Sequence, residues 1–132
     1  MVLLWQSMPT QNGQAADVVL GQPDGASVDV NTPPSRGALQ FRNPTYLTID
    51  GTRLFVADTS NHRVLIWNKL PRGGTTPPDV VLGQPDFIAG LPNTGLAAPT
   101  AATLFSPTAV AVGSGRLAVA DANNNRVLLW NQ

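Results

Sequence analysis

Short runs of alternating apolar and polar residues predict that this chain is built from β-strands. Residues 45–50 alternate so that Leu47 and Ile49 share one face of an extended segment, the period of two expected of a half-buried strand. Residues 108–113 repeat the pattern, with valines in the places of Leu47 and Ile49. Both segments therefore predict strands with one apolar face.

Three further runs complete a set of four strands. Asp50 and Gly51 form a tight-turn signal that leads into the apolar run 54–57, so a hairpin is predicted there. The next run, 64–67, is apolar on both faces, as expected of a strand buried between neighbouring sheets. After a loop rich in Pro and Gly comes 79–82, and the proline that soon follows it suits an outer, edge-like strand.

The order of strands recurs because the sequence itself is repeated. Residues 17–24 recur unchanged as 79–86, a shift of 62. Residues 53–68 recur at 116–131, a shift of 63, with 11 of the 16 positions identical, and a truncated copy of the same segment opens the chain at 2–5. Searching for such repeats comes first, because they decide the fold. A nine-stranded β-sandwich is the alternative fold, but a sandwich has no reason to repeat its sequence at this interval.

Tandem sets of four antiparallel strands predict an all-β propeller in which each set is one blade. Residues 1–132 form one domain of two blade-lengths, about 1–63 and 64–126, with a partial third copy at 127–132. The chain thus begins and ends inside a blade. Such a piece would leave apolar faces and strand edges uncovered, so we expect it to associate with other chains or to be part of something longer.

The segments 43–50 and 54–67 resemble the NHL repeat, whose blades form propellers, commonly of six. The Asp-x-x-Asn-x-Arg-Val core of that repeat stands at 58–64 and again at 121–127. The resemblance covers most of the chain and is closest to bacterial NHL-repeat proteins, which are often multi-blade and extracytoplasmic and whose functions are mostly unassigned. It implies a six-bladed ring completed by homo-oligomerisation, with a trimer favoured over a four-bladed dimer.

Ring closure requires a missing outer strand to come from a neighbouring chain. Residues 127–130 lack such a strand, and residues 17–20 of a neighbour can supply it. Residues 2–5 then duplicate a strand that is already present, so one of the two copies must be displaced, disordered or paired elsewhere. We expect this to be the N-terminal copy. A head-to-tail contact of this kind generates a ring when the rotation closes.

The polar residues shared by the two repeats predict a scaffold. They are Asp58, Asn61 and Arg63 in the first copy and Asp121, Asn124 and Arg126 in the second. Asp and Asn side chains bond turn amides, and an Arg can tie the turn to a neighbouring blade. Three tryptophans, Trp5, Trp67 and Trp130, also occupy equivalent positions, which predicts packing between sheets rather than ligand platforms.

Candidate catalytic chemistry is scarce. The chain has no cysteine and one histidine, His62, whose counterpart is Asn125, so we expect a solvated turn position there. Related six-bladed enzymes place metal-binding acids, Asn or His around the central channel. The corresponding inner positions here are Tyr46, Thr48, Ala109 and Ala111. Phosphate-loop, serine-elbow and zinc-protease motifs are missing, so we predict a non-enzyme without catalytic residues, metal or cofactor.

The composition limits the kinds of partner that the chain can bind. Eight Lys plus Arg balance eight Asp plus Glu, and 12% of the residues are charged, which disfavours nucleic acid and membrane surfaces as partners. A hydrophobic content of 42% argues against disorder. The start resembles no signal peptide and no stretch is long enough to cross a bilayer. We expect a cytoplasmic protein as written, and an extracytoplasmic one if the chain is cut from a longer secreted parent.

Two long loops, 25–42 and 87–106, differ between the repeats, and varied loops on a repeated scaffold are the usual place for binding. Our candidate ligand-binding residues are Phe41, Arg42, Phe87, Leu91 and Asn93. We therefore expect a self-assembling scaffold or binding module for a protein or small molecule. The alternatives are a hydrolase or lyase whose site forms only in the complete ring, and a fragment or engineered piece without its own activity.

Overall fold

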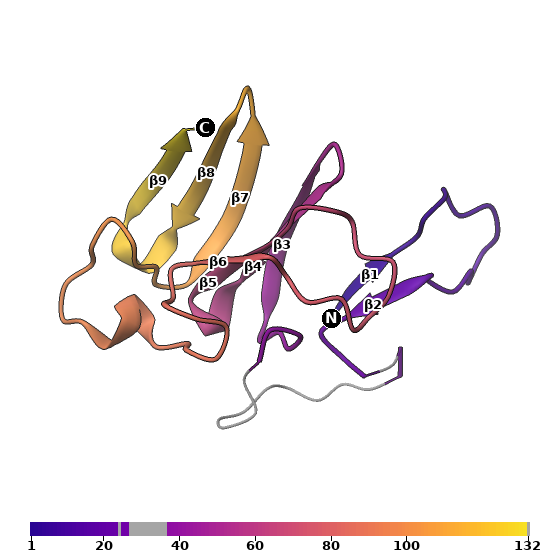
Figure 1. Ribbon diagram of the computed structural model, residues 1–132, viewed down its shortest axis with the longest axis horizontal. Coiled ribbons are helices and arrows are strands. Elements are labelled where there is room, and N and C mark those ends of the chain that lie inside the picture. The colour runs from indigo at the N-terminus through magenta and orange to yellow at the C-terminus, as the bar shows by residue number, and fades with distance from the viewer. Residues whose placement is uncertain (24, 27–36, 132) are drawn as a thin grey trace.

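The computed structural model describes residues 1–23, 25–26 and 37–131, and the described chain forms three sheets that lie side by side (Figure 1). The strands are β1 (Val2–Leu4), β2 (Val18–Leu20), β3 (Pro44–Asp50), β4 (Arg53–Asp58), β5 (Arg63–Trp67), β6 (Val80–Leu82), β7 (Pro107–Gly113), β8 (Arg116–Asp121) and β9 (Arg126–Asn131). Three short 3-10 turns join them: η1 (Thr59–Asn61), η2 (Pro92–Gly95) and η3 (Ala122–Asn124).

The sheet order follows the predicted repeat. The first sheet pairs β1 with β2, the middle sheet has the order β3-β4-β5-β6, and the last has the order β7-β8-β9. All the strand pairs are antiparallel. The all-β class and the set of four consecutive antiparallel strands are therefore confirmed. In the described chain the first sheet has the last two strands of a set, the middle sheet has all four, and the last sheet has the first three.

The hydrophobic core lies on both faces of the middle sheet, which the other two sheets cover (Figure 1). Toward the first sheet, the core consists of Leu54, Val56, Leu65 and Trp67 with Val2, Val18, Leu20 and Phe41. Toward the last sheet, it consists of Phe55, Val64 and Ile66 with Leu104, Val110 and Val119. Each residue of β5 is buried, which confirms the prediction of a strand that is apolar and covered on both sides.

The three equivalent tryptophans differ in burial. Trp67 is buried, as predicted, but Trp130 is only half-buried and Trp5 is exposed. The expectation of a packing role for all three was wrong for Trp5, because no described sheet lies on its outer side. Trp130 stands on β9, an edge strand that has no outer strand beside it in the described chain. Equal sequence positions therefore have unequal cover.

The loop from each outer strand to the next inner strand is held in the same way in both repeats. Gly21 forms a parallel bridge with Gln40, and Gly83 forms one with Thr103.

Thr45 and Thr59 join the middle sheet to the last one: the Thr59 hydroxyl donates to the Pro107 carbonyl at 2.7 Å. Together with the bond from the Thr45 hydroxyl to the Thr108 carbonyl, this bond connects the middle sheet to the last sheet. No helix within the described residues is long and apolar enough to cross a membrane.

Candidate functional site

The first copy of the polar motif is a buried cluster at the turn between β4 and β5. The Asp58 carboxylate accepts hydrogen bonds from Arg63 Nε and Asn61 Nδ2, both at 2.8 Å, and from the backbone N–H of Arg42 at 2.7 Å. Asp58, Asn61 and Arg63 have no exposed surface. The turn closes because His62 adopts a left-handed conformation with φ of 54°. The motif therefore fixes the chain reversal from inside.

Arg63 also connects β5 to two loops. Its Nη1 donates to the Phe87 carbonyl at 2.6 Å, and its Nη2 donates to the carbonyls of Gly37 and Gln40 at 3.1 and 2.7 Å. Burial raises the pKa of the Asp58 carboxyl, and the Arg63 guanidinium acts against that rise as the next largest effect. Arg63 thus connects β5 to Asp58 and to the carbonyls of two loops.

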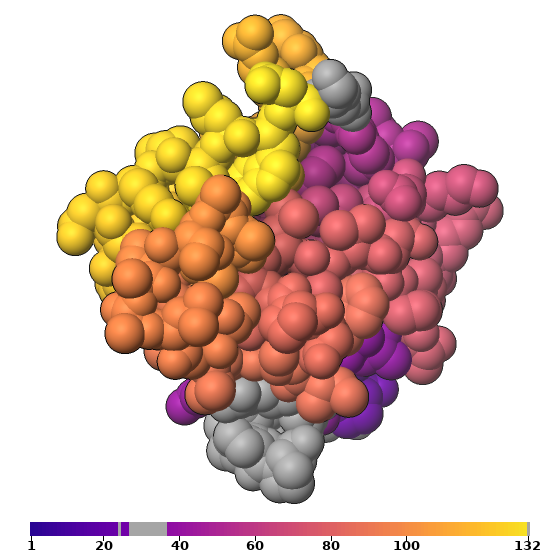
Figure 2. All heavy atoms as spheres, turned by 60° about the vertical axis from the view of Figure 1, so that its left-hand side comes forward, coloured from indigo at the N-terminus to yellow at the C-terminus, as the bar shows by residue number. Residues whose placement is uncertain are grey.

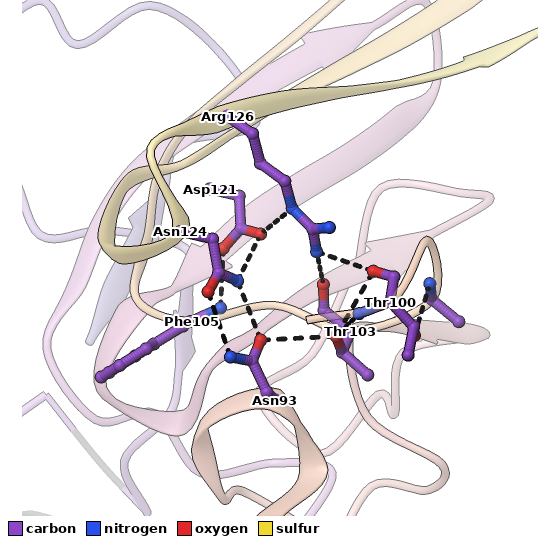
Figure 3. A network of polar contacts seen from close by, with 8 residues as sticks. Asn93, Thr100, Thr103, Phe105, Asp121, Asn124 and Arg126 are labelled. Carbon is purple, nitrogen blue, oxygen red and sulfur yellow. Dashed lines mark hydrogen bonds and ion pairs between the residues drawn. The ribbon is translucent and has the colours of Figure 1, made fainter. Parts of the chain in front are cut away.

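The second copy repeats this geometry around Asp121 (Figure 3). Asp121 accepts from Arg126 Nε and Asn124 Nδ2, both at 2.7 Å, and from the Phe105 N–H at 2.7 Å. Arg126 donates to the carbonyls of Thr100 and Thr103, again at 2.7 Å. A quarter of its side chain stays exposed. The second cluster is thus built like the first but lies at a less covered place.

The expectation that His62 is exposed to solvent was wrong. Its ring is half-buried, and Nδ1 accepts a hydrogen bond from the backbone N–H of Ser106 at 3.1 Å. The ring also meets Phe105 edge-to-face, with 5.3 Å between centroids. His62 therefore joins the middle sheet to the loop before β7. Its counterpart Asn125 is exposed, because no further sheet follows in the described chain.

The five loop candidates lie in different environments. Phe41 is buried and meets Trp67 edge-on, with 6.3 Å between ring centroids. Asn93 is buried and exchanges two side-chain hydrogen bonds with Asn124, at 2.8 and 3.0 Å. Phe87 is half-buried against the part of the core between the first and middle sheets. Arg42 and Leu91 are exposed, so these two are the ones with surface available to a ligand.

A groove of about 210 Å³ is lined by residues of both the middle sheet and the last sheet. Phe55, Ile66, Leu82, Val112, Leu117 and Trp130 form most of its wall, with Arg53 and Arg116 beside them. The indole N–H of Trp130 has no hydrogen-bond partner among the described residues. In contrast, Trp5 and Trp67 donate to the carbonyls of Gln14 and Thr76, at 3.1 and 3.0 Å. Sequence reasoning did not find this groove, because its lining residues come from two sheets and meet only in the folded chain.

The outer face of the last sheet is apolar and open. Val127 and Leu129 are 63% and 67% exposed, whereas their counterparts Val64 and Ile66 in the middle sheet are 0% and 8% exposed. Figure 2 shows the C-terminal segment, in yellow, at the surface of this side of the molecule. Single exposed apolar residues are ordinary, but a repeated interface position that loses its cover is a candidate contact surface.

The opposite side of the molecule has a matching open face. Leu47 and Ile49 on β3 are 42% and 48% exposed. Their counterparts on β7 are Val110, which is buried, and Val112, which packs against the part of the core between the middle and last sheets. A hollow of about 300 Å³ lies beside them between β1 and β3. The described part of the chain contains no group of three or more His, Cys, Asp or Glu residues that could hold a metal ion.

Neither a scan against protein-family models nor a search of curated proteins found a match for this chain.

Proposed function

We propose that this chain is a non-enzymatic NHL-type β-propeller scaffold that works by joining further blades to its two open faces. The observation that carries the proposal is the contrast between equivalent positions. Val64 and Ile66 are buried between two sheets, and Val127 and Leu129 are exposed at the end of the stack. The second pair has the same place in the repeat, so the surface it forms suits another sheet of the same kind.

Energetics supports association. Burying apolar surface contributes about 25 cal/mol per Å², and both open faces present branched apolar side chains at the positions that form the internal interfaces. The two faces differ from one another, so contact between copies is head-to-tail and closes into a ring when the rotation permits. Because each chain holds two blade-lengths, three chains would form a ring of six blades. A dimer with four blades is the alternative.

Partners other than a second copy would meet the loops. Arg42 and Leu91 are exposed there, and they suit a protein or small-molecule ligand. The balanced charge of the chain supports such ligands over nucleic acid, which requires a basic surface.

The test is the mass of the chain in solution, measured by native mass spectrometry and light scattering over a range of concentrations. We expect a single species of three chain masses. The matched control is the double variant Val127→Asp and Leu129→Asp, which places charge on the open face without touching the core; it should be a monomer with an unchanged circular dichroism spectrum. A parent chain that stays monomeric throughout would contradict the proposal.

A further inference from the structure

The strands β1 and β9 have the same sequence. Residues 2–5 and 127–130 both read Val-Leu-Leu-Trp. β1 pairs with β2 in the register Val2 to Leu20, Leu3 to Val19 and Leu4 to Val18. The middle sheet uses the equivalent register between β5 and β6. The place beside β2 therefore accepts the β9 sequence with the same side chains in the same positions.

β1 covers only part of the middle sheet. It covers the area around Trp67 but leaves Leu47 and Ile49 exposed on β3. The hollow of about 300 Å³ lies between β1 and β3 and is lined by residues 1–3 and 44–47. At the other internal interface, the inner half of the middle sheet faces β7 and β8, whose valines pack against it. Thus β1 lacks the two inner strands that would complete the interface.

β9 is attached to those two strands. It pairs with β8, which pairs with β7, so a last sheet that docks on a second chain brings cover for Leu47 and Ile49 as well. Val127 and Leu129, now exposed, would take the places of Val2, which is buried, and Leu4, which is half-buried. Replacing β1 by the β9 of another chain would therefore keep the same side chains beside β2 and add new apolar contact at β3.

A hydrogen-bond donor on β9 also fits the place that β1 occupies. Trp5 donates its indole N–H to the Gln14 carbonyl, and Trp67 donates to Thr76, the residue equivalent to Gln14 in the next repeat. Trp130 carries the same donor without a partner in the described chain. The Gln14 carbonyl of a second copy stands where that partner belongs, since Gln14 leads into β2.

We propose that β9 of one chain displaces β1 of a second chain and pairs with that chain's β2. This rests on the proposed self-association and specifies its route. The expected register joins Leu128 to Val19, with Trp130 donating to Gln14. β1 is then a removable cover that holds the interface in the free chain and competes with assembly.

Removing the cover tests the competition. Deletion of residues 1–5 empties the place beside β2, and we expect the dissociation constant of the assembly to fall by at least about tenfold. Analytical ultracentrifugation of the parent and the shortened chain measures this change. A folded, shortened chain that associates no more tightly than the parent overturns the proposal.

A disulfide test works even if the shortened chain does not fold. The chain has no cysteine, so Leu128→Cys combined with Val19→Cys introduces the only two thiols. Facing residues of paired antiparallel strands lie close enough for a disulfide. We expect covalent oligomers on non-reducing gels. The matched control combines Leu128→Cys with Val81→Cys. Val81 is equivalent to Val19 but pairs with Leu65 inside the middle sheet, so that variant should form no covalent oligomers on the same gels.

The outcomes separate the two proposals. If the parent chain associates but the cysteines at 19 and 128 form no more oligomer than the control pair, strand exchange is wrong and the scaffold proposal stands. If the parent and shortened chains are both monomeric, both proposals fail.

Discussion

Arg63 and Arg126 are the same residue of the repeat in two different surroundings. Each pairs with the aspartate at the end of the preceding strand and with two loop carbonyls. Arg63 has one further acceptor, Phe87, from the loop after β6 and is fully buried, whereas Arg126 is partly exposed. Because breaking an ion pair costs most where the remaining charge stays buried, the two residues should differ in their effect on stability.

Arg63→Ala should lower the free energy of unfolding by about 3–5 kcal/mol, since it leaves Asp58 buried without its cation. Arg126→Ala should cost clearly less. Urea denaturation at one fixed chain concentration measures both. Equal losses would show that burial does not set the effect.

The Arg63→Ala variant should also depend on pH. Burial raises the pKa of Asp58, and loss of Arg63 removes the main opposing effect. A carboxyl whose pKa is higher in the folded than in the unfolded state binds more protons when folded, so it favours folding as the pH falls. The deficit of Arg63→Ala relative to the parent should therefore shrink in acid. A deficit that grows as the pH falls would contradict this.

Trp67 and Trp130 allow a similar comparison for apolar packing. Trp67→Ala removes a buried indole and should cost about 3–5 kcal/mol. Trp130→Ala removes a half-buried one and should cost less in the free chain. Thermal unfolding at one chain concentration gives the order of the two. Trp67→Ala melting within a degree or two of the parent would rule out its core role.

At the scale of the element, the loop that leaves each outer strand depends on a glycine. Gly83 has φ of 89°, and a Cβ added there would lie 2.6 Å from the side chain of Leu104, which is fully buried. Gly21 is in the same relation to Phe41. The glycine lets the loop pass directly over the core residue that follows it, and the next inner strand starts from that contact.

Gly83→Ala should therefore destabilise the chain more than Gly51→Ala. Both glycines have positive φ, but a Cβ at Gly51 would meet nothing within 4 Å, so its substitution reports backbone strain alone. The added loss at Gly83 should come from collision with Leu104, and differential scanning calorimetry measures it. Equal melting temperatures would mean that the collision relaxes freely.

At the scale of the whole molecule, the described residues form three sheets in a row, and among these only the middle one is covered on both sides (Figure 1). The end sheets offer apolar faces, and the described residues offer no metal-binding group of side chains. The apolar end faces support the proposed scaffold role.

Calcium or zinc at micromolar concentration should accordingly leave the melting temperature unchanged. A ligand that binds only the folded state raises its stability with concentration. Scanning fluorimetry with each metal, against a chelator control, checks this prediction. A saturable rise would contradict the prediction that the chain binds no metal.

The sequence by itself determined the strands and their order. Alternation at 45–50 and the doubly apolar run at 64–67 are local patterns, and the repeat carries each assignment from one copy to the next. The spacing of the polar motif also identified its three residues, because the aspartate and the arginine that it joins lie five positions apart across one tight turn.

Only the tertiary structure decided how much cover each copy receives. His62 is half-buried because the loop before β7 lies against it, and Phe41 is buried because it packs onto Trp67. The clearest case is the identical sequence of β1 and β9. Val2 is 5% exposed and Val127 is 63% exposed, since burial depends on whether another sheet lies alongside, and four identical residues carry no information about that neighbour.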